Sequence, residues 1–142
     1  MTYLLDTNTC IYIINKKPPS VVKRIRARRP EDIAISTITI AELEYGVARS
    51  KFPERNRAAL MEFLLPFSIL EFDQIAATFY GIIRSGLDKM GNPIGSMDML
   101  LAAQARSRNL TMVTNNESEF KRVEGLEIEN WARPYFRGGG DA

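Results

Sequence analysis

Short apolar segments alternate with longer helical segments along the chain, which is the pattern of strands that alternate with helices. Buried strands are predicted over residues 2–5, 33–36, 68–72 and 110–113, and residues 126–128 are a candidate last strand at an edge. This alternation predicts a parallel sheet of four to five strands with helices on both faces. The expected fold is a three-layer α/β/α sandwich.

The segments between the strands have the periodicity or the end signals of helices. Helices are predicted over residues 7–16, 20–29, 39–50, 53–65, 73–90, 96–108 and 116–121. The clearest is 73–90, where apolar residues recur on one face from Ile75 to Met90. Residues 1–132 are expected to form one domain. Residues 133–142, with three consecutive glycines, are expected to be a flexible tail.

The composition is that of one soluble globular domain. The chain has 142 residues, of which 45% are hydrophobic and 25% are charged. Cys10 lies in an apolar stretch and has no second cysteine to pair with, so it is predicted to be a buried free thiol. No apolar stretch reaches membrane-spanning length, and the first residues lack the pattern of a signal peptide. A cytoplasmic protein with no membrane partner is therefore expected.

Four acidic residues lie where an apolar segment meets a turn or the start of a helix: Asp6, Glu42, Asp98 and Glu119. Asp6 directly follows the first predicted strand, and residues 114–116 directly follow the fourth. Glu42 and Asp98 lie in the first turns of helices that approach the same edge. Because ligands of parallel sheets bind at the carboxyl ends of the strands, we expect the four acids to converge there.

Each acid taken singly also has a structural explanation. Two pairs have the spacing of a capping box, in which a glutamate reaches back to the cap residue: Thr39 with Glu42, and Asn116 with Glu119. Asp98 follows Ser96, the predicted cap of its helix, at a position where the helix dipole favours negative charge. Asp6 can cap the helix that begins near Asn8.

The acids taken together favour a divalent cation. Clustered carboxylates repel one another, and a bound cation offsets that repulsion. The chain has no histidine, so imidazole cannot serve as base or ligand, and zinc binding through Cys and His is excluded. Oxygen-only ligands favour Mg²⁺ or Mn²⁺. A few carboxylates with Mg²⁺ and retained waters are the usual arrangement for phosphate-ester chemistry.

Four separate motifs in this order also resemble a known family. They are Leu4-Leu5-Asp6-Thr7-Asn8, Ala41-Glu42-Leu43 with Gly46, Ile94-Gly95-Ser96-Met97-Asp98 with Leu101-Ala102-Ala103, and Val113-Thr114-Asn115-Asn116 with Glu119-Phe120. The set resembles the PIN-domain ribonucleases and especially the VapC-type toxins of toxin–antitoxin pairs. The closing Val123-Glu124-Gly125-Leu126 and Glu129-Asn130-Trp131 also fit that group, so the resemblance covers residues 2–131. The resemblance implies a Mg²⁺-dependent endoribonuclease, usually a homodimer, whose partner is a VapB-type antitoxin that blocks the site with its C-terminal segment.

The resemblance also assigns roles by position. Asp6 and Asp98 would be the principal metal ligands, and Glu42 a third acid that binds metal directly or through water. Many family members have an aspartate near Asn116, so here either Glu119 supplies the fourth acid or Asn116 contributes only a hydrogen bond. Three further residues are candidates for supporting the ligands, together with Asn116: Thr7, Asn8 and Thr114.

The proposed reaction is hydrolysis of an RNA phosphodiester, with tRNA as one candidate substrate. Water activated by Mg²⁺, or by Mn²⁺ in its place, would attack the phosphorus atom of the phosphodiester. The products would have 5′-phosphate and 3′-hydroxyl ends. Glu42 or Glu119 would orient that water or accept its proton. The net charge is +2, and basic residues gather early in the chain. Five of them are candidates for guiding the RNA backbone, although a solvated helix face is the alternative: Lys16, Lys17, Lys23, Arg24 and Arg28.

Two other functions compete with the nuclease hypothesis. An aspartyl-phosphate phosphatase also begins with a strand that ends in aspartate, but it needs a second aspartate where this chain has Asn8. A catalytically weak RNA- or partner-binding module would keep the fold without the chemistry. Asn116 supports that alternative, whereas the acids at Asp6, Glu42 and Asp98 oppose it.

Overall fold

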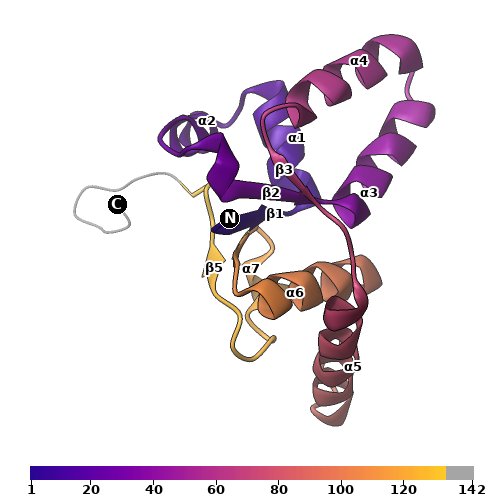
Figure 1. The fold of residues 1–142 in the computed structure, drawn as a ribbon, viewed down its shortest axis with the longest axis vertical. Helices are drawn as coiled ribbons and strands as arrows, with labels where there is room; N and C mark the ends of the chain where they lie inside the picture. The colour runs from indigo at the N-terminus through magenta and orange to yellow at the C-terminus, as the bar shows by residue number, and fades with distance from the viewer. Residues whose placement is uncertain (134–142) are drawn as a thin grey trace.

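Five parallel strands form the central sheet of the computed structural model, which describes residues 1–133 (Figure 1). The strands are β1 (Tyr3–Leu5), β2 (Ile33–Ser36), β3 (Ser68–Leu70), β4 (Thr111–Val113) and β5 (Ile128–Glu129). Their order across the sheet is β3-β2-β1-β4-β5. The predicted tail lies, apart from Arg133, outside the described residues.

Helices cover both faces of this sheet. One face carries α1 (Thr7–Asn15), α2 (Pro19–Arg26), α3 (Thr37–Ala48) and α4 (Pro53–Leu64). The other face carries α5 (Gln74–Lys89), α6 (Ser96–Arg108) and the short α7 (Glu117–Phe120). A 3₁₀ turn, η1 (Pro30–Asp32), leads into β2. The predicted three-layer sandwich is confirmed.

The two cores follow from the alternation of side chains along each strand. Leu4 and Ala34 are partners in the sheet register and point into the core beneath α5 and α6. Leu5 and Ile35 are the next register pair and point into the core beneath α1 to α4. All four side chains are fully buried. Runs that are apolar at every position are expected in strands with both faces covered.

The start of α3 differs from the prediction. Ser36 caps this helix, because its hydroxyl accepts a hydrogen bond from the amide of Ile38 at 2.9 Å. Thr39 therefore lies within the helix, and the predicted capping box of Thr39 with Glu42 is wrong. The physical reason is that Glu42 uses its carboxylate for a contact outside its own helix.

Two other predicted caps are also wrong. Gly95, rather than Ser96, is the cap position of α6, and no side chain caps that end. Asn116 precedes α7 but makes no capping hydrogen bond there. Asp6, in contrast, caps α1 as predicted, since it accepts a hydrogen bond from the amide of Thr9. Cys10 is buried and free, as predicted. Among the helices of residues 1–133, none has the length and apolar character needed to cross a membrane.

Candidate active site

The order of the strands creates a crevice between β1 and β4. The chain passes from β1 outward to β2 and β3, and then returns to the other side of β1 as β4. Ligands of open α/β sheets bind at such a switch point, beyond the carboxyl ends of the strands. Asp6 follows β1 and Thr114 follows β4, so both residues lie at this point.

Asp6 is the most deeply placed of the four acids. It is only 5% exposed, and its Oδ1 accepts from the amide of Thr9 at 2.9 Å. Burial raises the pKa of Asp6, and the negative charge of Glu42 adds to this effect. Hydrogen bonds from Thr114 and Thr9 act in the opposite direction. The protein thus holds a carboxylate in a position that disfavours its charge.

Asp98 and Glu119 form a carboxyl pair beside Asp6. Burial, a hydrogen bond with Glu119 and the charges of Glu119 and Asp6 together raise the pKa of Asp98 to about 7. Asn116 opposes this rise, because its Nδ2 donates to Asp98 Oδ2 at 3.2 Å. The amide of Gly95 donates to Glu119 Oε1 at 3.2 Å. Two carboxyl groups that share a hydrogen bond hold one proton between them.

Glu42 approaches the cluster from the first half of α3. The hydroxyl of Thr7 donates a hydrogen bond to Glu42 Oε1, across 35 positions of the sequence. Thr7 is the first residue of α1, directly after Asp6. This contact therefore fixes the glutamate next to the buried aspartate.

The four acids have no positively charged partner. No ion pair within residues 1–133 involves Asp6, Glu42, Asp98 or Glu119. Within the same residues, no three acidic or thiol side chains converge as a complete ligand set for one ion. Mg²⁺ is commonly held by only one or two carboxylates and completes its shell with water. The oxygen-only donors of Asp6 and Asp98 meet that requirement, so the residues present fit this ion.

Comparison with known proteins identifies the family to which this fold belongs. The family model described as "PIN domain" matches residues 3–126. The chain belongs to the PIN-domain family. Within the family it belongs with the VapC ribonucleases. It is 43% identical to the "tRNA(fMet)-specific endonuclease VapC" of Shigella flexneri, over 93% of this chain and 99% of that protein. It is 44% identical to "Ribonuclease VapC2" of Rickettsia felis, over 92% and 98% of the two chains.

Solved structures of such proteins have the same fold. VapBC2 from Rickettsia felis, bound to a promoter DNA fragment, matches with a TM-score of 0.86 and 43% identity, over 92% of this chain and 99% of that chain. DNA-bound VapBC from Salmonella typhimurium matches with a TM-score of 0.87 and 41% identity, over 92% and 98%. The PIN-domain resemblance inferred from the motifs is thus confirmed.

Three of the four predicted supporting residues contact an acid of this PIN domain. Thr7 bonds to Glu42, Thr114 to Asp6, and Asn116 to Asp98. Asn8 is exposed on the second position of α1. Asn116 and Glu119 both contact Asp98, and which of the two fills the fourth position of the site stays a prediction. The catalytic roles themselves stay predictions.

The basic residues predicted to guide RNA have different surroundings. Lys16 and Lys17 are exposed at the end of α1. Arg24 donates to the carbonyl oxygen of Asn130 at 2.7 Å. Arg28 packs over the ring of Trp131, with 4.6 Å between the guanidinium carbon and the ring centroid. Both arginines therefore contribute to the PIN domain's own packing.

Some side chains that position the site were not anticipated from the sequence. Ser36 donates to Gln104 Oε1, and Gln104 Nε2 donates to the carbonyl oxygen of Leu70 at 3.3 Å. This buried network fastens α6, which carries Asp98, to the ends of β2 and β3. Gly95, whose amide holds Glu119, was also missed as a contact. No local signal marks these contacts, because each joins residues that are more than 20 positions apart.

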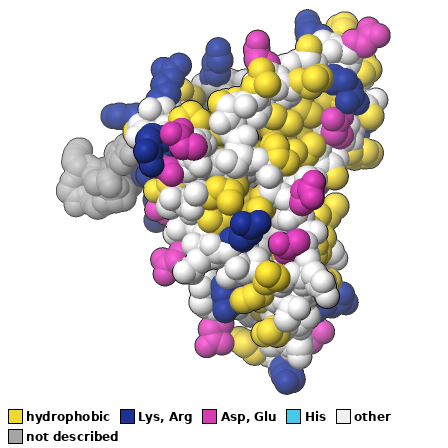
Figure 2. All heavy atoms as spheres, viewed as in Figure 1, with side chains coloured by type: hydrophobic (Ala, Val, Ile, Leu, Met, Phe, Trp, Pro, Cys, Tyr) yellow, Lys and Arg dark blue, Asp and Glu magenta, His cyan; other side chains and the backbone are white. Residues whose placement is uncertain are grey.

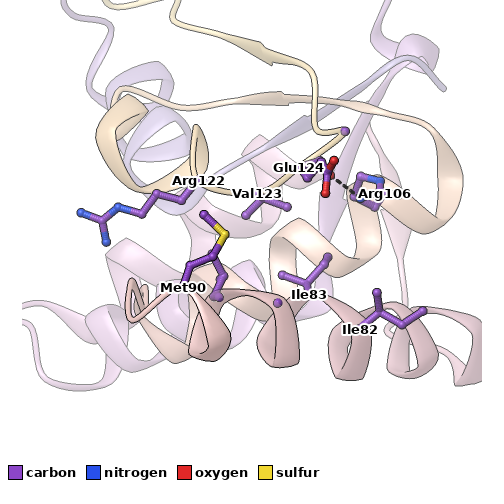
Figure 3. Close-up of a pocket in the computed structure, with 10 residues that line it drawn as sticks. Ile82, Ile83, Met90, Arg106, Arg122, Val123 and Glu124 are labelled. Carbon is purple, nitrogen blue, oxygen red and sulfur yellow. Dashed lines mark hydrogen bonds between the residues drawn. The ribbon is translucent and has the colours of Figure 1, made fainter.

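A separate hollow of the PIN domain lies away from the acids. A cavity of about 370 Å³ is bounded by α5, α6 and residues 122–125 (Figure 3). Arg106 donates to the carbonyl oxygen of Glu124 beside this cavity. None of the four acids lines it. This cavity therefore contains none of the candidate catalytic side chains.

Proposed function

We propose that this chain is a Mg²⁺-dependent endoribonuclease that acts as the toxin of a VapBC-type pair. The observation that carries the proposal is the gathering of Asp6, Glu42, Asp98 and Glu119 at the switch point without a cationic side chain from residues 1–133. Such a cluster is costly for the protein alone. It suits a hard divalent cation, and with it the phosphate of a nucleic acid.

RNA is the proposed substrate, and tRNA is the first one to test. Relatives from Shigella flexneri and Salmonella typhimurium, at 43% and 41% identity, are named tRNA(fMet)-specific endonucleases. Other relatives at similar identity are named simply ribonucleases. These names support an RNA phosphodiester as the scissile bond more strongly than they support one particular tRNA.

The chemistry assigns separate tasks to the acids. Asp6 and Asp98 would hold the ion, which when bound supplies charge neutralisation at the phosphate and acidifies water. Glu42, whose carboxylate accepts a hydrogen bond from Thr7, would orient the attacking water and accept its proton. Glu119 shares a hydrogen bond with Asp98, and this contact helps to raise the pKa of Asp98 before the ion binds. Because water attacks, the 2′-hydroxyl takes no part, and the products carry 5′-phosphate and 3′-hydroxyl ends.

A VapB-type antitoxin is the proposed protein partner. Two adjoining hollows of about 350 and 340 Å³ lie along α1 and α4, and they share Ile14 and Ala59. Hydrophobic side chains gather in the upper half of the face drawn in Figure 2, over α3 and α4. The first hollow reaches Thr7 and Glu42. An apolar helix placed in this trough would end at the catalytic acids, which is how an antitoxin segment would block them.

Cleavage of RNA by purified protein tests the proposed function. Wild type and Asp6→Asn are incubated with a pool of structured RNAs that includes tRNA, with Mg²⁺, with Mn²⁺ or with chelator. Metal-dependent cutting by wild type alone, with 5′-phosphate ends, is expected. Equal cutting by both proteins, or 2′,3′-cyclic phosphate ends, would contradict the proposal. Size-exclusion chromatography with light scattering tests the expected homodimer separately.

The same experiment separates the nuclease from a catalytically weak binding module. A module of that kind would bind RNA or a partner protein without metal-dependent cutting. Asn116, which stands where many family members have aspartate, is the residue that favours it. The retention of four acids around the switch point favours the enzyme.

A further inference from the structure

One side of α1 carries a row of side chains to which the catalytic mechanism gives no role. Asn8 and Tyr12 are four residues apart and lie on the same side of α1, and Lys16, four residues further on, is the left-handed residue directly after the helix. Asn8 and Lys16 are exposed, and Tyr12 is half-buried. These three residues, together with Asn115, are called the Tyr12 stripe below.

Asn115 connects this row to the active site. It lies between Thr114 and Asn116, whose side chains bond to Asp6 and Asp98 respectively. The side chain of Asn115 is exposed, and its Nδ2 donates to the hydroxyl of Tyr12 at 2.7 Å. The segment that follows β4 thus supports the catalytic acids with two residues and reaches α1 with the third.

The position and charge of the stripe suit a strand that leaves the reacting phosphate. Asn8 is two residues beyond Asp6, and from Asn8 to Lys16 the helix rises roughly 12 Å. Residues 7–17 contain no acidic side chain, and they end in Lys16 and Lys17. A polyanion that follows α1 away from the acids would therefore meet no like charge on this helix.

The neighbouring side of the same helix has a different character. Ile11 and Ile14 line the apolar trough against α3 and α4, which suits a protein helix. The Tyr12 stripe presents amide, phenol and ammonium groups instead. Aromatic and cationic side chains in a row are typical of single-stranded nucleic acid sites, and Asn, Tyr and Lys commonly contact phosphate and sugar.

We infer that the Tyr12 stripe binds the RNA strand adjacent to the cleaved bond. This inference rests on the proposed nuclease function and adds to it the path of the substrate over the protein surface. It also divides α1 between two partners, with RNA on the Tyr12 side and protein on the Ile11 side, and Lys16, which lines the second hollow as well, lies at the boundary between them.

Binding of a fluorescein-labelled single-stranded RNA, measured by anisotropy, tests the inference. The background is full-length Asp98→Asn, which is expected not to cleave the probe. Lys16→Glu should raise Kd about tenfold and lower the dependence on salt by about one counterion. Asn115→Ala and Tyr12→Phe should each raise Kd about threefold through loss of one polar contact. Lys89→Glu, at the end of α5 on the other face of the sheet, makes the same change of charge and should alter Kd less than about twofold.

The outcomes separate this inference from the proposed function. Equal weakening of RNA binding by Lys16→Glu and Lys89→Glu would overturn the inference, since the change in net charge alone would explain the loss of affinity. Unchanged binding in both Asn115→Ala and Tyr12→Phe would overturn it as well. Tyr12→Phe keeps the ring that packs on the core, and unchanged melting temperatures confirm that the variants fold. If wild type fails to cut any RNA with Mg²⁺, the proposed function fails instead, whatever the stripe variants do.

Discussion

Acidic side chains at the carboxyl edge of the sheet and acidic side chains that form ion pairs elsewhere on the protein have opposite surroundings. Glu44 lies 2.8 Å from Arg57, and Glu129 lies 3.7 Å from Arg28. At the edge, Asp6 and Asp98 face other carboxylates, and their pKa values are raised. The first arrangement is compatible with folding alone. The second disfavours the charged forms of Asp6 and Asp98, and a bound divalent cation would offset that cost, as the proposed function requires.

The largest effect on RNA cleavage is expected when a negative charge is removed from the carboxyl edge of the sheet. Asp98→Asn should reduce metal-dependent RNA cleavage more than about 100-fold, because loss of a ligand exceeds the usual effect of losing a ligand's supporting contact. The same change removes like-charge repulsion and should raise the unfolding free energy of the metal-free protein at pH 8. Cleavage rates and urea unfolding of the two proteins measure both effects. A variant that loses activity and stability together would indicate a structural aspartate.

The second largest effect is expected in the pH dependence of stability and of Mg²⁺ affinity, which Asp98 at the carboxyl edge should control. With a folded-state pKa of about 7, Asp98 favours the metal-free fold at low pH, and this contribution is lost as pH rises from about 4 through 7. Metal binding needs the ionised form, so Mg²⁺ affinity should rise about tenfold between pH 6 and pH 8. Calorimetric titration with Mg²⁺ at several pH values measures this affinity. An affinity that is flat across this window would show that Asp98 is not the titrating ligand.

Much of this comparison was predictable from the sequence, because topology follows from the alternation of strands and helices. Asp6 lies at the end of a strand by local pattern alone, and the parallel order then brings Asp98 toward it. The caps were not predictable in the same way. Glu42 has capping-box spacing from Thr39, but its carboxylate is taken by Thr7 on another helix. The Asp98–Glu119 pair likewise depends on a long-range contact, the amide of Gly95.

A substitution among the residues that stabilise the fold should have the reverse effect of Asp98→Asn, because it should lower stability and leave RNA cleavage unchanged. Arg28 packs over Tyr3 at 5.0 Å and over Trp131 at 4.6 Å, so Arg28→Ala should lower the unfolding free energy by about 1–2 kcal/mol. Cleavage per folded molecule should not change. Arg28 was predicted from sequence to guide RNA. A raised KM with unchanged stability would favour that role over the packing role.

The smallest effect is expected at an exposed ion pair. Glu44→Gln breaks the contact with Arg57 and should change the unfolding free energy by less than about 1 kcal/mol, because exposed pairs contribute little. RNA cleavage should stay at the wild-type rate. The variant is therefore the matched control for Asp98→Asn, since each replaces one carboxylate by an amide. Equal loss of activity in both would remove the distinction between the two regions.

The most direct test of a cation site at the carboxyl edge is the melting temperature of wild type and Asp98→Asn with increasing Mg²⁺ or Mn²⁺. An ion that binds only the folded protein raises its stability with the logarithm of ion concentration relative to Kd. The wild-type melting temperature should rise with metal concentration, while that of Asp98→Asn should start higher and respond little. An unresponsive wild type, or an equal response in both proteins, would contradict the account of four acids held together for a divalent cation.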